Sequence, residues 1–315
     1  MAHRIQMLIK ILQRNNFAVA LLIITAGCAS RTLKTPPPSA AAPTVTSSIA
    51  LTSTSVTKSD SQALHSDVLP DSLEAAVNSS YRTPENAKRD QYRHPRETLA
   101  FFGLKPKMTL VEITPGAGWY TEILAPYLAT SGQYIAAIPP AGANAVMNET
   151  SAKVIAWIKS HKEFNGHVKV ADFAPPDNLI LAPDGSADMV VTFRNIHNWM
   201  AKGYERAVFE SFFRALKPGG ILGIEEHREN PNAKRDGKAA SGYVLEKDVI
   251  RLAESIGFKF ESKSEINANK KDSKDHPEGV WTLPPTLKLK DKNREKYLAI
   301  GESDRMTLKF VKPNK

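Results

Sequence analysis

The sequence has a single cysteine, Cys28, among its 315 residues, which excludes an intramolecular disulfide. It has no block of five or six like charges, so its formal net charge of +9 does not indicate a nucleic-acid-binding tail. Its longest apolar run is too short to cross a bilayer comfortably. What is left is an ordinary globular composition, with 42% apolar and 24% charged residues, and we expect no nucleic-acid partner.

The N-terminus has the layout of an export signal. Basic residues among residues 3–14 precede the apolar run "FAVALLIITAG" and a group of small residues that ends at Cys28. The segment "TAGC" resembles a bacterial lipobox, in which the chain is cut before the cysteine and the thiol is lipidated. More than one acyl chain on a cysteine anchors a protein stably. We therefore expect a signal peptide at 1–27, export to the periplasmic side or cell envelope, and membrane attachment through Cys28. A plain signal peptide or a short membrane helix is the alternative.

A segment poor in large apolar residues follows the signal. Residues 28–80 are rich in serine, threonine, alanine and proline and cannot bury a core, which predicts a flexible, disordered stalk. Thr83, Pro84 and Glu85 then form a helix-start signal, with a capping hydroxyl, a proline for the first turn and an acid. We place the folded domain at 81–315.

Strand and helix patterns alternate through that domain. Predicted strands are 108–113, 133–138, 167–173, 187–193, 221–227, 258–266 and 306–313, and predicted helices are 119–129, 145–164, 204–216 and 245–257. This alternation predicts a doubly wound α/β fold with a mostly parallel sheet. The segment 267–305 is long for a connection and holds several large apolar residues, so we expect an ordered flap over the sheet edge.

A glycine turn follows the first predicted strand, in "EITPGAG". Gly116 and Gly118 allow a sharp turn and the close approach of a ligand, and the next helix offers unpaired N–H groups. The spacing is not G-x-G-x-x-G, because Thr121 stands where the third glycine would be. The turn therefore suits a dinucleotide poorly.

Three segments together resemble class I S-adenosylmethionine-dependent methyltransferases: "VEITPGAGWYTEILAP", "ADF" after the third strand and "ALKPGGIL" before the fifth. The segments "FRNIHNWM", "EEHRENP" and "GESDRMTLKFVKP" are similar to a bacterial, often exported subfamily of that family. The resemblance covers about residues 81–315. It implies a Rossmann-like sheet of seven strands with the last antiparallel, and S-adenosylmethionine as the cofactor.

The resemblance also implies a set of cofactor-binding residues. Glu112, Gly116 and Gly118 would form the cofactor loop, and Asp172 would meet the adenine amino group. We also count Asn195, just after the fourth strand, among these residues. One acid usual in the family is missing: Ile138 and Pro139 stand where a carboxylate would bind the ribose hydroxyls. Glu122 or the acids of 271–278 are the alternative sources of that contact.

The chemistry-bearing residues gather after the fourth and fifth strands. Methyl transfer from a sulfonium needs mainly positioning, and a base helps when the acceptor carries a proton. We predict His197 as that base and His227 as the second candidate, with Glu226 beside them. Two histidines near carboxylates also permit a metal, but no tight ligand spacing supports one, so we predict none. No hydrolase, zinc-protease or phosphate-loop motif is present in the sequence.

Two functions of different classes follow. The first is an S-adenosylmethionine-dependent methyltransferase that acts on a small-molecule or envelope-component acceptor. The second is a non-catalytic envelope binding protein on the same fold, which the missing ribose acid favours. Reuse of the pocket for hydrolysis is a third, weaker option.

Overall fold

The computed structural model describes residues 68–140, 142, 145–164 and 166–314. The predicted signal peptide, Cys28 and most of the predicted stalk lie outside these residues. Helix α2 (Leu73–Val77) falls inside the predicted stalk, yet Ala76 is buried and packs in the same cluster as residues of the next helices. The folded domain therefore begins earlier than the predicted boundary at residue 81. Among the described residues, no helix has both the length and the apolar character to cross a membrane.

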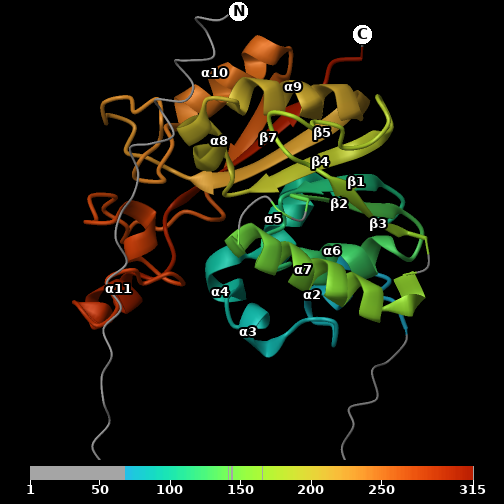
Figure 1. Cartoon of the computed structure of the whole chain (residues 1–315), viewed down its shortest axis with the longest axis horizontal. Coiled ribbons are helices and arrows are strands. Elements are labelled where there is room, and N and C mark those ends of the chain that lie inside the picture. The colour runs from blue at the N-terminus through green and yellow to red at the C-terminus, as the bar shows by residue number, and fades with distance from the viewer. Residues whose placement is uncertain (1–67, 141, 143–144, 165, 315) are drawn as a thin grey trace, which may run out of the picture. The chain divides into compact units, whose positions relative to one another are not determined.

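A seven-stranded sheet forms the centre of the fold, in the order β3-β2-β1-β4-β5-β7-β6 (Figure 1). Its strands are β1 (Thr109–Ile113), β2 (Gln133–Ile138), β3 (Val168–Asp172), β4 (Ala187–Phe193), β5 (Leu216–His227), β6 (Lys259–Ser264) and β7 (Arg305–Val311). Strands β1 to β5 pair in parallel, and β7 is antiparallel to both β5 and β6. The seven strands, the parallel majority and the antiparallel last strand are confirmed, and the topology is that of the Rossmann-like methyltransferase fold.

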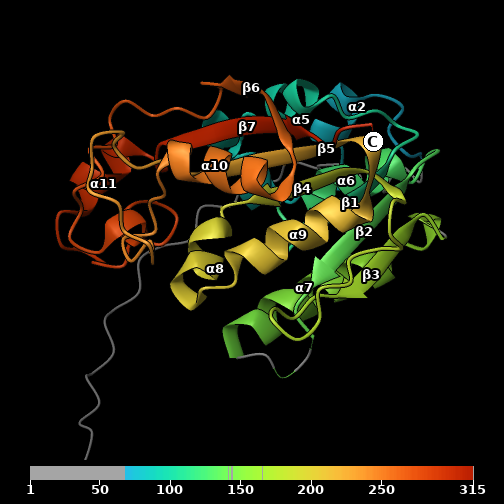
Figure 2. The ribbon, with the colours of Figure 1, turned by 90° about the horizontal axis from the view of Figure 1, so that it is seen from above.

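Helices cover both faces of this sheet. Besides α2, the helices of the described residues are α3 (Pro84–Ala87), α4 (Asp90–Arg93), α5 (Pro95–Phe102), α6 (Thr121–Leu128), α7 (Ala145–Ser160), α8 (Ile196–Lys202), α9 (Glu205–Ala215), α10 (Glu246–Ile256) and α11 (Arg294–Ile300). Figure 2 shows α8, α9 and α10 in front of the sheet, and Figure 1 shows α5, α6 and α7 on its other side.

Two hydrophobic clusters hold these layers together. Along β1, Val111 and Ile113 belong to the cluster with α8, α9 and α10, whereas Leu110 belongs to the cluster with α5, α6 and α7. Successive side chains of a strand point to opposite faces, so one apolar strand serves both clusters. The central strand β4 is buried along almost its whole length, which explains its nearly continuous apolar run.

Several short helices were not expected from the sequence. Helices α4, α5, α8 and α11 have eight residues or fewer, too few turns for a clear apolar period. The predicted helix start at Pro84 is confirmed, but the Thr83 hydroxyl does not cap the helix. It donates to Glu122 instead, 3.2 Å away. The predicted capping role of Thr83 is therefore wrong, because a buried carboxylate on α6 takes the hydroxyl.

The segment 267–305, which we call the flap, is ordered as predicted. It contains α11 and the 3₁₀ turn Gly279–Thr282, and it buries Val280, Leu283 and Tyr297. Its backbone is tied to the body of the domain, since the Val280 N–H donates to the Ser241 carbonyl at 2.9 Å. These contacts give the flap one fixed path beside the carboxyl ends of the strands.

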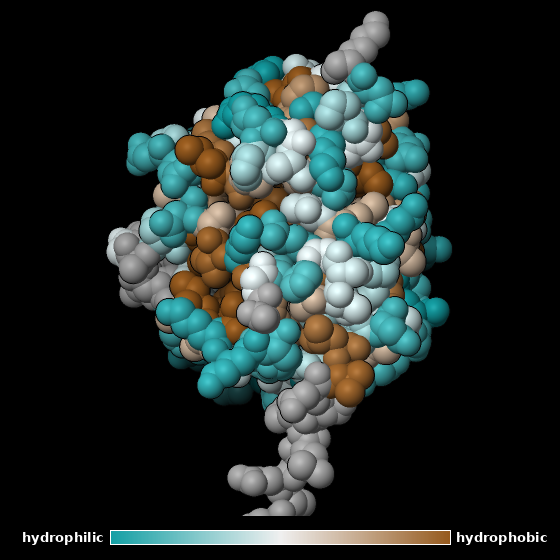
Figure 3. Space-filling model, turned by 90° about the vertical axis from the view of Figure 1, so that its right-hand side faces the viewer, coloured by the Kyte–Doolittle hydropathy of each residue, from teal (hydrophilic) through white to brown (hydrophobic). Residues whose placement is uncertain are grey.

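The opposite edge of the sheet is less well covered. Strand β3 has exposed positions, and Val170 on it and Ile180 after it are large apolar side chains open to solvent. Figure 3 shows the corresponding face, where hydrophobic patches are separated by hydrophilic residues.

Candidate functional site

The glycine turn opens a cavity of about 280 Å³ at the carboxyl ends of β1 and β4. Gly116 has a φ of +61°, and a Cβ added there would meet no protein atom within 4 Å. Gly118 differs, because a Cβ there would lie 3.2 Å from Val154 on α7. Gly116 therefore leaves space for a ligand, whereas Gly118 leaves space for helix packing.

Glu112 lies at the floor of this cavity. It is 2% exposed, and its Oε2 accepts hydrogen bonds from the Tyr134 hydroxyl at 2.6 Å and the Thr121 hydroxyl at 3.3 Å. Burial raises the pKa of Glu112 to about 7, against the lowering effect of these two hydrogen bonds. A buried carboxyl that ionises only near neutrality is unfavourable for stability, and it suits a cationic group of a ligand.

Asn195 joins the ends of β1 and β4. Its side-chain amide donates to the Ile113 carbonyl at 2.9 Å and to the Thr192 hydroxyl at 3.2 Å, and the residue lines the same cavity. Its amide N–H groups therefore shape the cavity wall rather than pointing freely at a ligand.

Two other acids predicted to meet the cofactor lie elsewhere. Asp172, at the end of β3, is exposed and does not line the cavity. Its predicted contact with adenine stays a prediction. The Glu122 carboxylate is taken up by Thr83, whose backbone N–H donates to it at 2.9 Å. Glu122 is therefore a poor substitute for the missing ribose acid.

A second cavity, of about 230 Å³, lies under the flap. Its walls combine His197 and His227 with flap residues that include Trp281 and Ser303. Arg93, Arg194 and Pro285 line both cavities. The two cavities therefore adjoin, one at the glycine turn and one beside the histidines.

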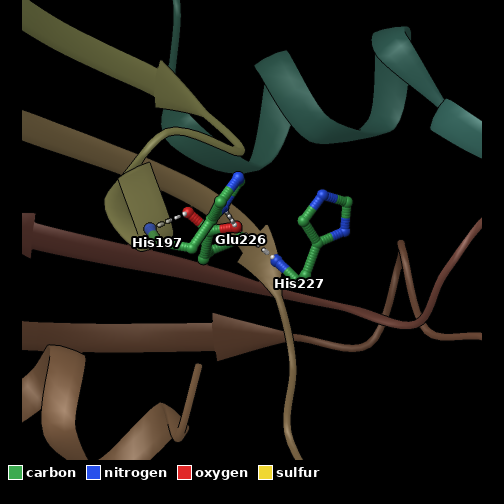
Figure 4. Close-up of side chains that lie close together, drawn as sticks. All are labelled: His197, Glu226 and His227. Atoms are coloured by element: carbon green, nitrogen blue, oxygen red, sulfur yellow. Dashed lines mark hydrogen bonds and ion pairs between the residues drawn. The ribbon is translucent and has the colours of Figure 1, made fainter. Parts of the chain in front are cut away.

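The histidines are positioned by Glu226, as Figure 4 shows. Glu226 is fully buried, and its Oε1 lies 3.0 Å from His197 Nδ1. The same carboxylate accepts from the backbone N–H groups of Ile196 at 2.6 Å, His197 at 3.3 Å and His227 at 2.8 Å. Because the carboxylate only accepts, His197 Nδ1 is the donor and its Nε2 is left as an acceptor.

His227 is held from the other side. Its Nδ1 lies 2.6 Å from the Ser303 hydroxyl at the end of the flap. Burial, together with the charges of Arg194, Arg305 and Arg93, lowers the pKa of His227 well below its ordinary value. A neutral imidazole at neutral pH is thus favoured at this position.

The three residues also meet the distance requirement for a metal. One ligand atom of each of His197, Glu226 and His227 lies within 4.8 Å of the others. However, four donors already occupy the Glu226 oxygens. Arginine guanidinium groups also stand close by, which disfavours a cation. The chemistry of this donor set therefore fits an oriented base better than a metal centre.

An arginine cluster connects the two cavities, and sequence reasoning missed it. Buried Arg93 donates from Nε to Glu302 at 3.0 Å, and Arg305 lies 3.3 Å from the same carboxylate. Arg305 also lies 3.1 Å from Glu225, which Arg194 contacts at 2.6 Å. No sequence spacing signalled the cluster, because its members come from α4, β5, the flap and the loop after β4.

Two residues at the border of the cluster are placed by the ends of their elements. Arg93 ends α4 and lines both cavities. Asp304 pairs with Arg228 at 2.9 Å and its neighbour Arg305 with Glu225 at 3.1 Å, because consecutive residues at the start of β7 point to opposite faces of the sheet.

Trp119 and Trp199, which follow the first and fourth strands, take part in packing. Trp199 lies in the core against Phe212, with ring centroids 5.6 Å apart. Trp119 is 5% exposed, donates from Nε1 to the Asn86 carbonyl at 2.9 Å, and lies under the Arg93 guanidinium at 4.8 Å. Trp119 also lines the glycine-turn cavity, so it holds Arg93 at the boundary between the two cavities.

Residues 111–224 match the family model described as a methyltransferase domain. The matched segment starts in β1 and ends in β5, so it contains the glycine turn, Asn195 and His197. The match to this family model implies that S-adenosylmethionine is the cofactor of the domain. No curated protein matches the sequence.

Solved structures match this chain at low identity. A SAM-dependent methyltransferase from Aquifex aeolicus is 17% identical, covers 76% of this chain and 98% of its own, and has a TM-score of 0.47. The arsenic(III) S-adenosylmethionine methyltransferase CrArsM from Chlamydomonas reinhardtii is 14% identical. The match covers 78% of this chain and 74% of CrArsM, with a TM-score of 0.45. The [4+2]-cyclase SpnF is 14% identical. The match covers 71% of this chain and 81% of SpnF, with a TM-score of 0.47. At these values the likenesses say nothing of the reaction.

Proposed function

We propose that this protein transfers a methyl group from S-adenosylmethionine, bound in the glycine-turn cavity, to an acceptor bound under the flap. The observation that carries the proposal is that the two cavities share Arg93, Arg194 and Pro285. A donor and an acceptor held in adjoining cavities can meet without either leaving its site. The match of 111–224 to a methyltransferase domain supports the same reaction.

The residues of the first cavity fit the cofactor. Gly116 leaves open space in the turn, and Glu112 provides a buried carboxylate for a positively charged group. The cofactor supplies an activated methyl group on a sulfonium. The protein then has to bind, orient and exclude water.

His197 is the proposed general base for an acceptor that carries a proton. It lines the acceptor cavity, and the hydrogen bond of its Nδ1 to Glu226 leaves Nε2 to accept a proton there. Glu226 is a positioning residue, because it is buried behind His197 and does not line the cavity. His227 is the second candidate for the base, fixed by Ser303.

Calorimetric titration of the full chain with S-adenosylmethionine and S-adenosylhomocysteine tests the proposal. We expect saturable binding, and we expect Gly116→Val to abolish it, since the new side chain would enter the cavity. Gly185→Val is the matched control, because Gly185 also has a positive φ, a Cβ there would meet no protein atom within 4 Å, and the residue lies outside the cavity. No binding by the parent protein at millimolar ligand would overturn the proposal.

The alternative of a non-catalytic envelope binding protein has no support from the family match. It makes a separate prediction, namely no transfer of a labelled methyl group to any component of an envelope extract. Transfer of label that depends on His197 would favour the enzyme. In either case the acceptor that we propose is a small molecule or an envelope component.

We also propose that the protein is an exported lipoprotein of the often exported bacterial subfamily, anchored at Cys28. The support is the signal layout and "TAGC" at the N-terminus. Cys28→Ser should release the protein from membranes. Attachment of that variant at high salt would favour an uncleaved helix instead.

A further inference from the structure

The arginine cluster has more positive than negative charge. Four arginines, Arg89, Arg93, Arg194 and Arg305, surround two carboxylates. These are Glu225 and Glu302, and both are buried. Each carboxylate already contacts at least two arginines, so two positive charges have no carboxylate of their own. Buried cations without a counter-charge are unfavourable.

Several guanidinium N–H groups in the cluster have no acceptor. Within the described residues, Arg93 makes its one side-chain hydrogen bond through Nε and Arg194 makes its one through Nη1. Arg89 Nη2 is buried without any partner. A guanidinium has five N–H donors in a fixed plane that matches the oxygens of a carboxylate or phosphate.

Two of the arginines with unused donors, Arg93 and Arg194, line the cavities. Arg93 is 5% exposed and Arg194 is half-buried, and both line the acceptor cavity. Trp119 fixes the Arg93 guanidinium from one side, and Glu302 fixes it from another. The donors are therefore pre-organised, which lowers the entropic cost of binding an anion.

We propose that the methyl acceptor carries a carboxylate or phosphate group, which Arg93 and Arg194 bind in the cavity under the flap. This inference rests on the proposed methyl transfer and names the class of its acceptor. The anion would neutralise the excess charge between the cavities. Its oxygens would take the free N–H groups, while His197 and His227 face the part of the acceptor that reacts. A cationic acceptor is disfavoured by the same charges.

The cofactor also carries a carboxylate. The experiment therefore has to distinguish binding of the cofactor's carboxylate from binding of the acceptor's carboxylate or phosphate. Inorganic phosphate and acetate are titrated into the full chain by calorimetry, with and without saturating S-adenosylhomocysteine. We expect phosphate to bind in both cases. Arg93→Gln and Arg194→Gln should each weaken phosphate binding at least tenfold, and Arg93→Lys should restore part of it.

Arg96→Gln is the control, because Arg96 lies on the neighbouring helix α5 in exposed pairs with Glu74 and Glu97, outside both cavities. It should bind phosphate as the parent does. Circular dichroism and the melting temperature report whether each variant is folded. If Arg93→Gln fails to fold, Arg93→Lys and Arg194→Gln give the same comparison.

Three outcomes would overturn the inference. The first is no phosphate or acetate binding by the parent protein at 100-fold the concentration that saturates S-adenosylhomocysteine. The second is equal binding by the arginine variants and the parent. The third is competition between phosphate and S-adenosylhomocysteine but not between phosphate and 5′-methylthioadenosine, which lacks the carboxylate. That third result would assign the arginines to the cofactor.

Failure of the proposed function gives a different result. In that case S-adenosylhomocysteine does not bind, and the phosphate titration without it still reports on the anion site.

Discussion

His197 Nδ1 lies 3.0 Å from Oε1 of Glu226, and both side chains are buried at the carboxyl ends of the strands. Glu226 comes from β5 and His197 from the first turn of α8, so the pair also fixes α8 to the sheet. The contact sets which nitrogen of the imidazole faces the acceptor cavity.

The first prediction concerns that tautomer. In the parent protein, nitrogen NMR should find neutral His197 protonated at Nδ1. Glu226→Gln presents an amide N–H₂ to groups that are themselves donors, so we expect the Nδ1-protonated form to lose population. We also expect the free energy of unfolding to fall by about 1–3 kcal/mol, as for a buried hydrogen bond that is left unmade.

His167 provides the internal control for this measurement. Its Nδ1 contacts the Gly132 carbonyl at 2.6 Å, far from Glu226 in the sheet. Its spectrum should be the same in both proteins. An unchanged His197 tautomer in the variant would show that Glu226 does not position the base.

The second prediction concerns Glu302, which joins three arginines. Burial alone would raise the pKa of its carboxyl, but Arg93, Arg305 and Arg89 outweigh burial and hold the pKa at about 2. The folded-state pKa is thus below the ordinary value of 4.5, so the stabilisation is present above pH 4.5 and is lost as the pH falls toward 2. Glu302→Gln should lower the free energy of unfolding at pH 7 by about 3 kcal/mol, since it leaves buried cations unpaired.

Urea unfolding from pH 7 down to pH 3 measures that effect. The difference between the parent and Glu302→Gln should shrink as the pH drops below 4.5. Glu278→Gln removes an exposed pair with Lys288 and should change stability by less than about 1 kcal/mol at every pH. A constant difference across the pH range would contradict the assigned role of Glu302.

The third prediction concerns Glu112, whose pKa is shifted in the opposite direction to that of Glu302. Burial raises the pKa of Glu112 to about 7, above its ordinary value of 4.5, so ionisation of Glu112 destabilises the fold as the pH rises through this window. Glu112→Gln should therefore increase the free energy of unfolding at pH 8 by about 3 kcal/mol and have little effect below pH 4.5. The variant should also bind S-adenosylmethionine more weakly, because it lacks the carboxylate.

A gain in stability with a loss of affinity would identify Glu112 as a residue kept for binding. The test is urea unfolding at pH 4 and pH 8 beside a calorimetric titration of the same preparations. A variant that is less stable at pH 8 would show that the carboxylate is paired more favourably than the structure indicates.

The fourth prediction concerns the packing of α5 on the sheet. A Cβ on Gly223 of β5 would lie 2.8 Å from the buried ring of Phe102. Gly223→Ala should therefore lower the free energy of unfolding by about 1–3 kcal/mol through overpacking. Gly237→Ala is the control, because nothing lies within 4 Å of a Cβ there and its φ is not positive.

Chemical denaturation of both variants decides this prediction. Phe102→Leu combined with Gly223→Ala should recover part of the loss, since the smaller side chain makes room for the methyl group. Equal stability of the two glycine variants would mean that α5 can move away from β5 at little cost.

Much of the fold was predictable from local pattern. The strands 133–138 and 187–193 were predicted at the bounds that the structure gives, because their apolar runs end at clear turn residues. Helix α10 was predicted within one residue at each end, since its apolar face has a regular period and Gly257 ends it. The short helices were not predictable, because one or two turns owe their conformation to tertiary contacts.

The candidate site also has one part that was predictable from the sequence and one part that was not. The sequence by itself determined the glycine turn and the histidines at the ends of the strands, because a strand, a turn and a helix are encoded in consecutive residues. Only the tertiary structure decided that Arg93, Glu225, Glu302 and Arg305 form one cluster, and that the flap encloses a second cavity beside the first. Charges that are up to about two hundred residues apart in the chain meet there because the sheet brings its strand ends together, and no local spacing records that meeting.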